Sequence, residues 1–307
     1  MTGEEPFIVR FWGVRGSYPT PGSHTVRHGG NTSCIEVQVG GHTLILDAGS
    51  GIIRLGNDLL RRSTGNLEIS LLLTHGHGDH LVGFPFFAPL FERRATIHLF
   101  GPRLAGKTVE QLVTPYMSPP YFPVELQKLP SNRTFHTLAE GESIIWRPGQ
   151  CAPEAVDGDM LQKSDAEVRV LAQYTSSHPL DGSVIYRIEY GGHSVVYSTD
   201  VEWNGAYDPE CVAVAKGTDL LIHDAQYTSS DYRTKHGFGH STIEMATGMA
   251  RAADVGELIL FHHEPTYDDD KLDWMEAEAR KLFASTRSAY EGLEIDIVAS
   301  KNERKDR

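Results

Sequence analysis

Three histidines and one aspartate lie within six residues of one another, directly after an apolar run, in the segment 75–80. The preceding residues 68–73 have the pattern of a buried strand. The segment has the order His-x-His-x-Asp-His, with a glycine at each x. Imidazole and carboxylate groups at this spacing can converge on a divalent cation, and the two glycines let the backbone turn tightly around it. Because histidines at this density repel one another when protonated, an ordinary polar turn explains the segment poorly. The sequence therefore predicts a metal site at the end of a buried strand.

This pattern resembles the signature of the metallo-β-lactamase superfamily, in which it follows a core strand and binds two metal ions. The resemblance implies three later ligands: a histidine in the second half, an aspartate after a strand, and a histidine near the C-terminus. The chain offers His178, Asp200 and His262, which follow the predicted strands 167–174, 194–199 and 257–261. Each alone would be an ordinary strand-end residue. In this order behind the first motif, they are candidate ligands.

The resemblance, with charge and geometry, predicts how seven ligands share two divalent metal ions. His75, His77 and His178 would hold the first ion, and Asp79, His80 and His262 the second, with Asp200 as the bridge. A water or hydroxide between the ions would be the nucleophile, because paired cations lower its pKa. Asp79 is also a catalytic candidate, since it could orient or deprotonate that water. Zn²⁺ is the expected metal, with Mn²⁺ or Fe²⁺ as alternatives.

The last ligand has an adjacent competitor. His262 and His263 follow each other, and successive residues leaving a strand point to opposite sides. Only one of them can be a ligand. His262 is preferred because it comes directly after the apolar run, as in the superfamily pattern.

The Gly-His-Ser-Thr segment at 239–242 predicts a catalytic histidine. Ser241 and Glu244 have the spacing of a capping box, which would begin a helix there and place His240 just outside its N-terminus. The segment resembles the phosphodiesterase branch of the superfamily, which includes the tRNA 3′-processing endonucleases and a related class of cyclic-nucleotide phosphodiesterases. In that branch this histidine contacts the scissile phosphate and can protonate the leaving oxygen. The alternative is a helix-entry residue bonded to local backbone.

Two glycine-rich loops near the N-terminus, at 13–17 and 29–33, are candidate phosphate-binding elements. Their backbone amides and polar side chains could donate hydrogen bonds to a phosphate. The predicted substrate-binding residues are Arg15, Asn31, Thr32, Ser33 and His240. Tight turns use the same residue types without any ligand. Asp47, in an Asp-x-Gly turn, is expected to organise the metal loop by hydrogen bonding.

The expected fold is α/β, a four-layer αββα sandwich, as the superfamily resemblance implies. We expect one domain over residues 1–307, because the candidate ligands span 75–262. A Pro-rich insertion covers about 102–165. The predicted strands are 7–13, 33–39, 42–47, 68–74, 95–101, 143–147, 167–174, 183–190, 194–199, 219–223, 257–261 and 293–298, and the predicted helices are 51–62, 241–253 and 268–290.

Composition limits the partners. The chain has no apolar run of 18 residues and no basic-plus-apolar leader, so we expect a soluble cytoplasmic protein without a membrane partner. Three distant cysteines suggest reduced thiols. The net charge of −13, from 28 basic and 41 acidic residues, argues against an extended nucleic-acid surface. The relatives in this branch are commonly dimers, and the sequence is compatible with a homodimer.

The preferred function is hydrolysis of small phosphodiesters, with cyclic nucleotides as the expected substrates. The alternative is a tRNA 3′-end endoribonuclease. In those enzymes a long arm that grips the tRNA lies between the second-lobe histidine and the bridging aspartate, yet only 22 residues separate His178 from Asp200. Lactam or thioester hydrolases of this fold lack the His-Ser-Thr segment, and an oxygen-reducing diiron relative would replace His77 with glutamate. A metal-bound scaffold without turnover is the non-enzyme alternative.

Overall fold

Two β-sheets form the centre of the protein. The computed structural model describes residues 5–157, 164 and 167–300, so the ends of the predicted domain and part of the predicted insertion lie outside the described residues. In spatial order, the first sheet comprises β15 (Glu294–Asp296), β1 (Phe7–Gly13), β2 (Cys34–Val39), β3 (His42–Leu46), β4 (Leu67–Leu72), β5 (Ala95–Pro102) and β6 (Asn132–Leu138). The second comprises β14 (Thr286–Ser288), β13 (Leu258–Phe261), β12 (Leu220–Asp224), β11 (His193–Ser198), β10 (Ser183–Tyr190), β9 (Val168–Thr175), β7 (Glu142–Trp146) and β8 (Glu154–Asp157).

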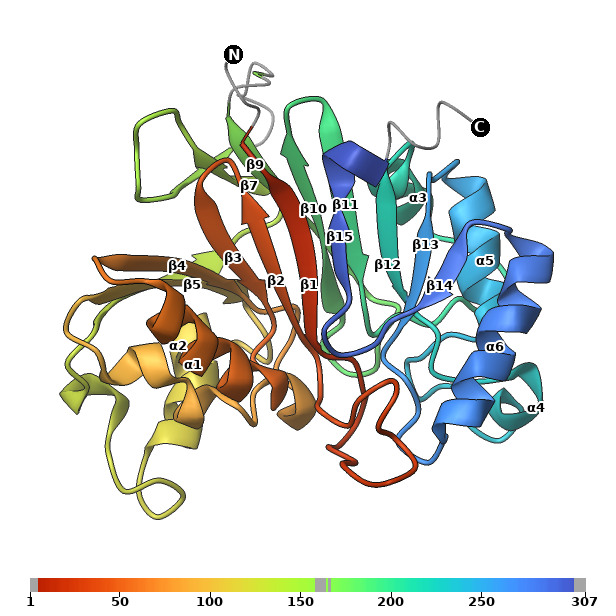
Figure 1. Cartoon of the computed structure of the whole chain (residues 1–307), viewed down its shortest axis with the longest axis horizontal. Helices are drawn as coiled ribbons and strands as arrows, with labels where there is room; N and C mark the ends of the chain where they lie inside the picture. Colours follow the sequence, from red (N-terminus) through yellow and green to blue (C-terminus); the bar gives the residue numbers. More distant parts are fainter. Residues whose placement is uncertain (1–4, 158–163, 165–166, 301–307) are drawn as a thin grey trace.

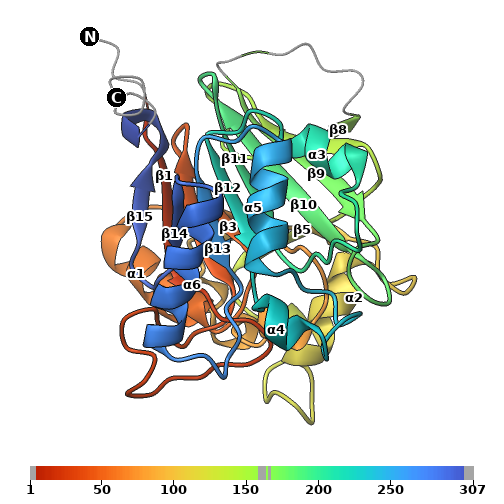
Figure 2. The ribbon, with the colours of Figure 1, turned by 90° about the vertical axis from the view of Figure 1, so that its right-hand side faces the viewer.

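Helices cover the outer face of each sheet, so the four-layer αββα prediction is confirmed (Figures 1 and 2). The helices α1 (Gly51–Arg62) and α2 (Val109–Val113) pack on the first sheet, and α3 (Pro209–Ala215), α5 (Ile243–Ala252) and α6 (Asp269–Leu282) pack on the second. The short helix α4 (Ser229–Tyr232) lies near the site loops. No helix among the described residues is long and apolar enough to cross a bilayer.

The core lies between the two sheets and under each helical layer. Strand β1 alternates buried and half-buried residues, as expected when one face meets the core. Its inward residues, including Phe11, join Ile188 and Phe261 of the second sheet in one buried cluster. Strand β4 is buried on both faces because α1 packs against its other side, through residues such as Ile52. This burial suits the leucines and the isoleucine that make up four of its six residues.

Several predicted boundaries were wrong. The predicted helix 268–290 ends at Leu282, and Thr286–Ser288 instead forms an edge strand parallel to β13. Pairing with a neighbouring strand outweighs a weak helical pattern there. Part of the described 102–165 insertion belongs to the sandwich, because β6 extends the first sheet while β7 and β8 extend the second.

The helix that follows His240 also begins later than predicted. Its N-cap is Thr242, whose Oγ1 accepts a hydrogen bond from the Met245 backbone N–H. The Ser241 hydroxyl instead donates to the Val201 carbonyl oxygen at 2.6 Å. The predicted Ser241–Glu244 capping box is therefore wrong, since a tertiary contact takes the hydroxyl that the motif needs.

Candidate metal centre

The loops that carry the candidate ligands meet at one edge of the sandwich. Strands β3 to β6 run parallel to one another, as do β11 to β14. Strand β9 is antiparallel to β10, which is antiparallel to β11, so β9 and β11 end at the same edge. The candidates follow β4, β9, β11 and β13. Side chains after the carboxyl ends of these strands can therefore converge from both sheets.

All seven candidate ligands converge in two sets. One set is His75, His77, His178 and Asp200, and the other is Asp79, His80, Asp200 and His262. Within each set, the possible ligand atoms lie within 4.8 Å of one another. These are the two sets that the sequence predicted, and metal binding by them stays a prediction.

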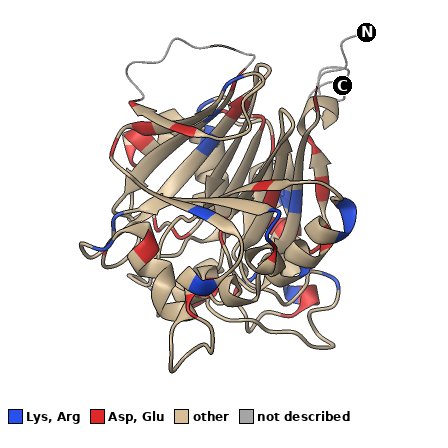
Figure 3. Ribbon diagram, turned by 90° about the vertical axis from the view of Figure 1, so that its left-hand side faces the viewer, with Lys and Arg blue, Asp and Glu red and all other residues tan. Residues whose placement is uncertain are grey.

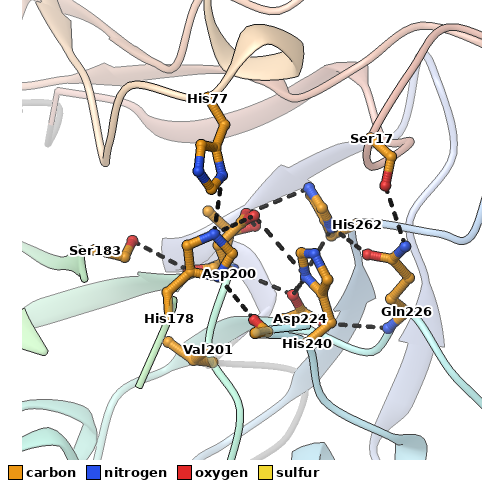
Figure 4. A network of polar contacts seen from close by, with 12 residues as sticks. Ser17, His77, His178, Ser183, Asp200, Val201, Asp224, Gln226, His240 and His262 are labelled. Carbon is orange, nitrogen blue, oxygen red and sulfur yellow. Dashed lines mark hydrogen bonds and ion pairs between the residues drawn. The ribbon is translucent and has the colours of Figure 1, made fainter. Parts of the chain in front are cut away.

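Asp200 lies between the two sets, with one oxygen turned to each (Figure 4). Its Oδ1 lies 3.6 Å from His75 Nε2 and 3.8 Å from His178 Nε2. Its Oδ2 lies 3.1 Å from His80 Nε2 and 3.3 Å from His262 Nε2. A carboxylate divided in this way is suited to bridge two cations.

Hydrogen bonds at Nδ1 orient the ligand histidines. His178 Nδ1 lies 2.9 Å from the Gly239 carbonyl oxygen, and His80 Nδ1 lies 2.8 Å from Asp47 Oδ2. His262 Nδ1 lies 3.0 Å from Gln226 Oε1. Each partner is an acceptor, so the proton lies on Nδ1 and Nε2 keeps the lone pair that a metal needs.

Asp47 organises the motif loop, as its turn sequence predicted. Its Oδ1 accepts a hydrogen bond from the Thr74 backbone N–H at 2.8 Å, and its Oδ2 accepts one from the Tyr197 hydroxyl at 2.9 Å. With His80, these contacts occupy both carboxylate oxygens. Asp47 therefore supports the ligands and is absent from both ligand sets.

The donor set fits divalent cations. His75 Nε2 is buried and has no hydrogen-bond partner among the described residues. His77 Nδ1 faces His178 Nε2 at 3.0 Å, and His80 Nε2 faces His262 Nε2 at 3.3 Å. Ring nitrogens that face one another beside buried carboxylates can bind a cation between them.

Burial favours the neutral form of the three histidines of the first set. It is the largest cause that lowers the pKa of His75, and it also lowers the pKa of His77 and His178. Burial raises the pKa of Asp79, but the nearby His80 and His262 outweigh it and hold that pKa below its usual range. Neutral imidazoles and an ionised carboxylate are the forms that bind metal.

Three residues of the centre have left-handed backbone conformations. The φ angles are 62° for Asp47, 54° for Asp200 and 59° for His262. Such angles are uncommon for residues other than glycine, and they cluster at functional sites. Here they aim strand-end side chains into the centre.

His240 lies beside the centre and is held by Asp224. Its Nδ1 lies 2.7 Å from Asp224 Oδ2 and 3.9 Å from Asp200 Oδ1, and its ring stacks on His262 at 4.8 Å (Figure 4). Burial lowers its pKa, but the Asp224 carboxylate outweighs burial and, with Asp200, raises the pKa of His240 to about 9. His240 is therefore a cation at neutral pH.

Asp224 could itself be counted among possible ligands, because it lies in a third group with Asp200, His240 and His262. Its oxygens already have partners, however. Oδ1 accepts hydrogen bonds from the backbone N–H groups of Ser241 and Gln226, and Oδ2 contacts His240. The structure therefore favours a supporting role.

Arg15, predicted to contact substrate, does not face the centre. It is fully buried, and its guanidinium donates to the carbonyl oxygens of Gly29, Glu264 and Tyr267. These bonds tie the N-terminal loop to the segment after β13. Nε and Nη1 are thus committed to backbone acceptors, while Nη2 is buried without a hydrogen-bond partner among the described residues, so these contacts do not support the predicted phosphate contact.

Two other predicted donors of this region have partners away from the centre. Asn31 contacts Glu291 and Ser50, and the Thr32 hydroxyl accepts a hydrogen bond from the Ser50 backbone N–H at 2.8 Å. Asn31 and Thr32 therefore join the loop to the start of α1, and these contacts do not support the predicted phosphate contacts. Ser33 is fully buried, and its hydroxyl has no hydrogen-bond partner among the described residues.

The same loop reaches the centre through residues that the sequence did not single out. The Ser17 backbone N–H donates to Asp79 Oδ2 at 2.8 Å. A Cβ atom on Gly16 would lie 2.4 Å from the His262 ring, so only glycine leaves room for that ligand. The glycine-rich composition of the loop was the available signal, and it indicated close packing against a ligand.

His262 and His263 have different surroundings. His262 lies in the second ligand set, whereas His263 Nε2 contacts the Ala289 carbonyl oxygen at 2.9 Å and its ring packs against His28. The structure thus places His262 in the centre, as the sequence predicted.

Gln226 was missed, because an isolated glutamine carries no motif. Its Oε1 contacts His262 Nδ1, and its Nε2 donates to Ser17 Oγ at 3.3 Å and to Glu264 Oε2 at 3.1 Å (Figure 4). Because Nε2 donates to these two oxygens, the amide oxygen Oε1 is the atom that faces the histidine. Gln226 therefore orients a ligand of the second set.

Gln226→Ala is expected to weaken metal binding at the second set by about 10–100-fold, the usual effect of removing a partner of a ligand histidine. Binding at the first set should be unchanged. Metal titration against a competing chelator measures both steps. Gln173→Ala, a half-buried glutamine on β9, is the control. Unchanged affinity in Gln226→Ala would show that His262 does not depend on this contact.

Comparison with known proteins agrees with this centre. The chain belongs to the family described as the beta-lactamase superfamily domain, whose pattern matches residues 42–263. The matched region includes every candidate ligand. The protein is therefore a metal-dependent hydrolase of the metallo-β-lactamase fold, and this fold implies divalent metals, typically two.

Individual relatives share most of their length with this chain. Ribonuclease Z from Gemmatimonas aurantiaca is 26% identical over 321 residues, covering 95% of this chain and 96% of that protein. Human tRNase Z, short form, superposes with a TM-score of 0.63 at 18% identity, over 94% of this chain and 99% of that chain. A diphosphatase from the PhnP family gives a TM-score of 0.64 at 16% identity, over 94% and 97%. The two superpositions show a shared fold.

Proposed function

We propose that the protein hydrolyses phosphodiesters with a dinuclear metal centre and His240 as its acid. The observation that carries this proposal is the position of His240, which is bonded to Asp224 and lies 3.9 Å from the oxygen of the shared Asp200. A cationic imidazole beside such a centre can bind a phosphate and give a proton to a leaving oxygen.

The residues of the centre have separate proposed roles. His75, His77, His178, Asp79, His80 and His262 would hold two divalent ions, with Asp200 shared between them. When bound, such ions activate water at neutral pH and neutralise the charge that develops on phosphate. Asp79, ionised and oriented by the Ser17 N–H, is placed to orient the attacking water. His240 keeps its proton at neutral pH because of Asp224 and would donate it to the leaving group.

RNA is the substrate class that the sequence comparisons support. Relatives from several bacteria and archaea, at 24–27% identity over 84% or more of this chain, are named Ribonuclease Z. We therefore propose a phosphodiester at an RNA 3′ end as the first candidate substrate.

A small cyclic phosphodiester is the second candidate, and one observation favours it. Residues 178–200, where the resemblance places the tRNA-gripping arm, form only the hairpin of β10 and β11. Figure 3 shows basic residues scattered among acidic ones along the visible ribbon, and the net charge of −13 disfavours a long polyanion. Both features suit a compact substrate with one phosphate.

A metal-defined substrate screen tests the proposal. The protein, loaded separately with Zn²⁺, Mn²⁺ or Fe²⁺, is assayed on a 3′,5′-cyclic nucleotide, a bis-aryl phosphate, a 3′-extended precursor tRNA, a lactam and a thioester. We expect turnover of phosphodiesters only, because His240 suits an oxygen leaving group. Site-specific tRNA trimming would support the first candidate, and cyclic-nucleotide turnover without trimming the second. Efficient lactam or thioester hydrolysis would overturn the proposal.

A further inference from the structure

An apolar groove lies beside the metal centre. It has a volume of about 370 Å³ and is lined by the aromatic residues Phe86, Tyr116, Tyr121 and Phe122, together with Val82 and two prolines. One wall of the groove contains Val82 and Phe86, which come shortly after the ligand motif. The other wall contains Tyr116, Tyr121 and Phe122, which belong to the Pro-rich segment after α2. All of these lining residues are apolar or aromatic, in contrast to the histidines and carboxylates of the centre.

The groove adjoins the centre. Gly78 lies between the candidate ligands His77 and Asp79, and a Cβ atom on it would lie 3.8 Å from the Tyr116 hydroxyl oxygen. Val82 comes two residues after His80. Among the candidate ligands, His77 is exposed and the other six are buried. The neighbouring Gly78 is also exposed, so the centre is open on the side where the groove begins.

The aromatic walls are accessible. Phe86 is 56% exposed and Tyr121 is 82% exposed. The Phe86 and Phe122 rings meet edge to face with centroids 5.8 Å apart, which leaves ring surface available to a further planar group. Large exposed aromatics that gather beside a polar centre indicate a binding surface.

We propose that this groove binds the base of a nucleotide whose phosphodiester lies at the metal centre. The inference rests on the proposed function and deepens it, because it limits the substrate to diesters that carry a base. A nucleotide has a charged phosphate and a planar aromatic base, and the two neighbouring surfaces match these parts. Base–aromatic stacking tolerates any base, so the groove selects for a base without selecting which one. An RNA end and a cyclic nucleotide share this chemistry.

Equilibrium binding tests the groove without turnover. Adenosine 5′-monophosphate and ribose 5-phosphate are titrated calorimetrically into the metal-loaded protein. The nucleotide should bind roughly 5- to 100-fold more tightly, the range for one stacking contact. Phe86→Ala and Tyr121→Ala should remove most of that difference and leave ribose 5-phosphate binding unchanged. Both side chains are largely exposed, so their truncation should not unfold the protein.

Steady-state kinetics then compare diesters that carry a base with a diester that does not. The same variants should raise KM and leave kcat unchanged for a base-bearing diester, either a 3′,5′-cyclic nucleotide or a dinucleoside monophosphate. A 3′,5′-cyclic diester of the base-free sugar should show no change. Trp274→Ala, which removes an exposed aromatic on α6, is the matched control.

Two results would overturn the groove assignment. One is equal affinity for the nucleotide and the sugar phosphate in the wild-type protein. The other is a change of oligomeric state in Phe86→Ala, measured by sedimentation, without a change in the affinity ratio, which would make the groove a contact between copies of the chain. Failure to hydrolyse any diester would contradict the proposed function, while the binding comparison would still test the groove.

Discussion

Asp200→Ala is expected to abolish hydrolysis and lower the metal content below two ions per chain. One Asp200 oxygen faces His75 and His178, and the other faces His80 and His262. Removing the carboxylate leaves two cations without the anion that separates them. The loss of activity should exceed the roughly 10–100-fold effect of losing a supporting partner. Elemental analysis and turnover of the best diester measure both effects.

Two further variants make this result specific. Asp200→Asn keeps the shape of the side chain and removes its charge, so it should also lose metal. Asp208→Ala removes the N-cap of α3, whose Oδ1 accepts the Glu210 backbone N–H at 2.8 Å. It should cost about 1 kcal/mol of stability and leave metal content unchanged. Full metal occupancy with normal turnover in Asp200→Ala would contradict a shared centre.

His240→Ala should keep both metals and slow hydrolysis by roughly 10²–10⁴-fold, the usual contribution of a general acid. His240 is absent from both ligand sets, which share only Asp200. If it protonates the leaving oxygen, the loss should be smaller for aryl esters, which leave readily, than for alkyl diesters. Measured rates on a series of leaving groups test this dependence. Equal losses across the series would make His240 a phosphate-binding residue without a role as acid.

The pH dependence gives a second readout for His240. Asp224 raises the pKa of His240 to about 9, so the acid is present at neutral pH and is lost as the pH rises through that value. Asp224→Asn removes this effect, and the basic limb of the pH–rate profile should move to lower pH. His236→Ala, an exposed histidine four residues earlier, is the matched control. An unmoved basic limb in Asp224→Asn would assign that limb to another group.

The ligand identities could be predicted from the sequence because the motif is local and strands impose direction. Four of the seven ligands lie within six residues, and the other three follow apolar runs that form β9, β11 and β13. The carboxyl ends of parallel strands share an edge, so strand order alone indicates that these side chains can meet. The four-layer fold was predicted from the resemblance to the superfamily, and the strand pattern alone did not give it.

The surroundings of the ligands required the tertiary structure. A sequence pattern shows that Arg15 can donate hydrogen bonds, but only packing shows that carbonyl oxygens near residues 29, 264 and 267 take them. Gln226 and Ser17 support the centre through contacts with residues 36 and 62 positions away along the chain. The sequence alone determined the ligand types and the strands that carry them, because both depend on local pattern. The tertiary structure decided which polar groups remain free for substrate, because most buried donors are satisfied by acceptors that the fold brings near them.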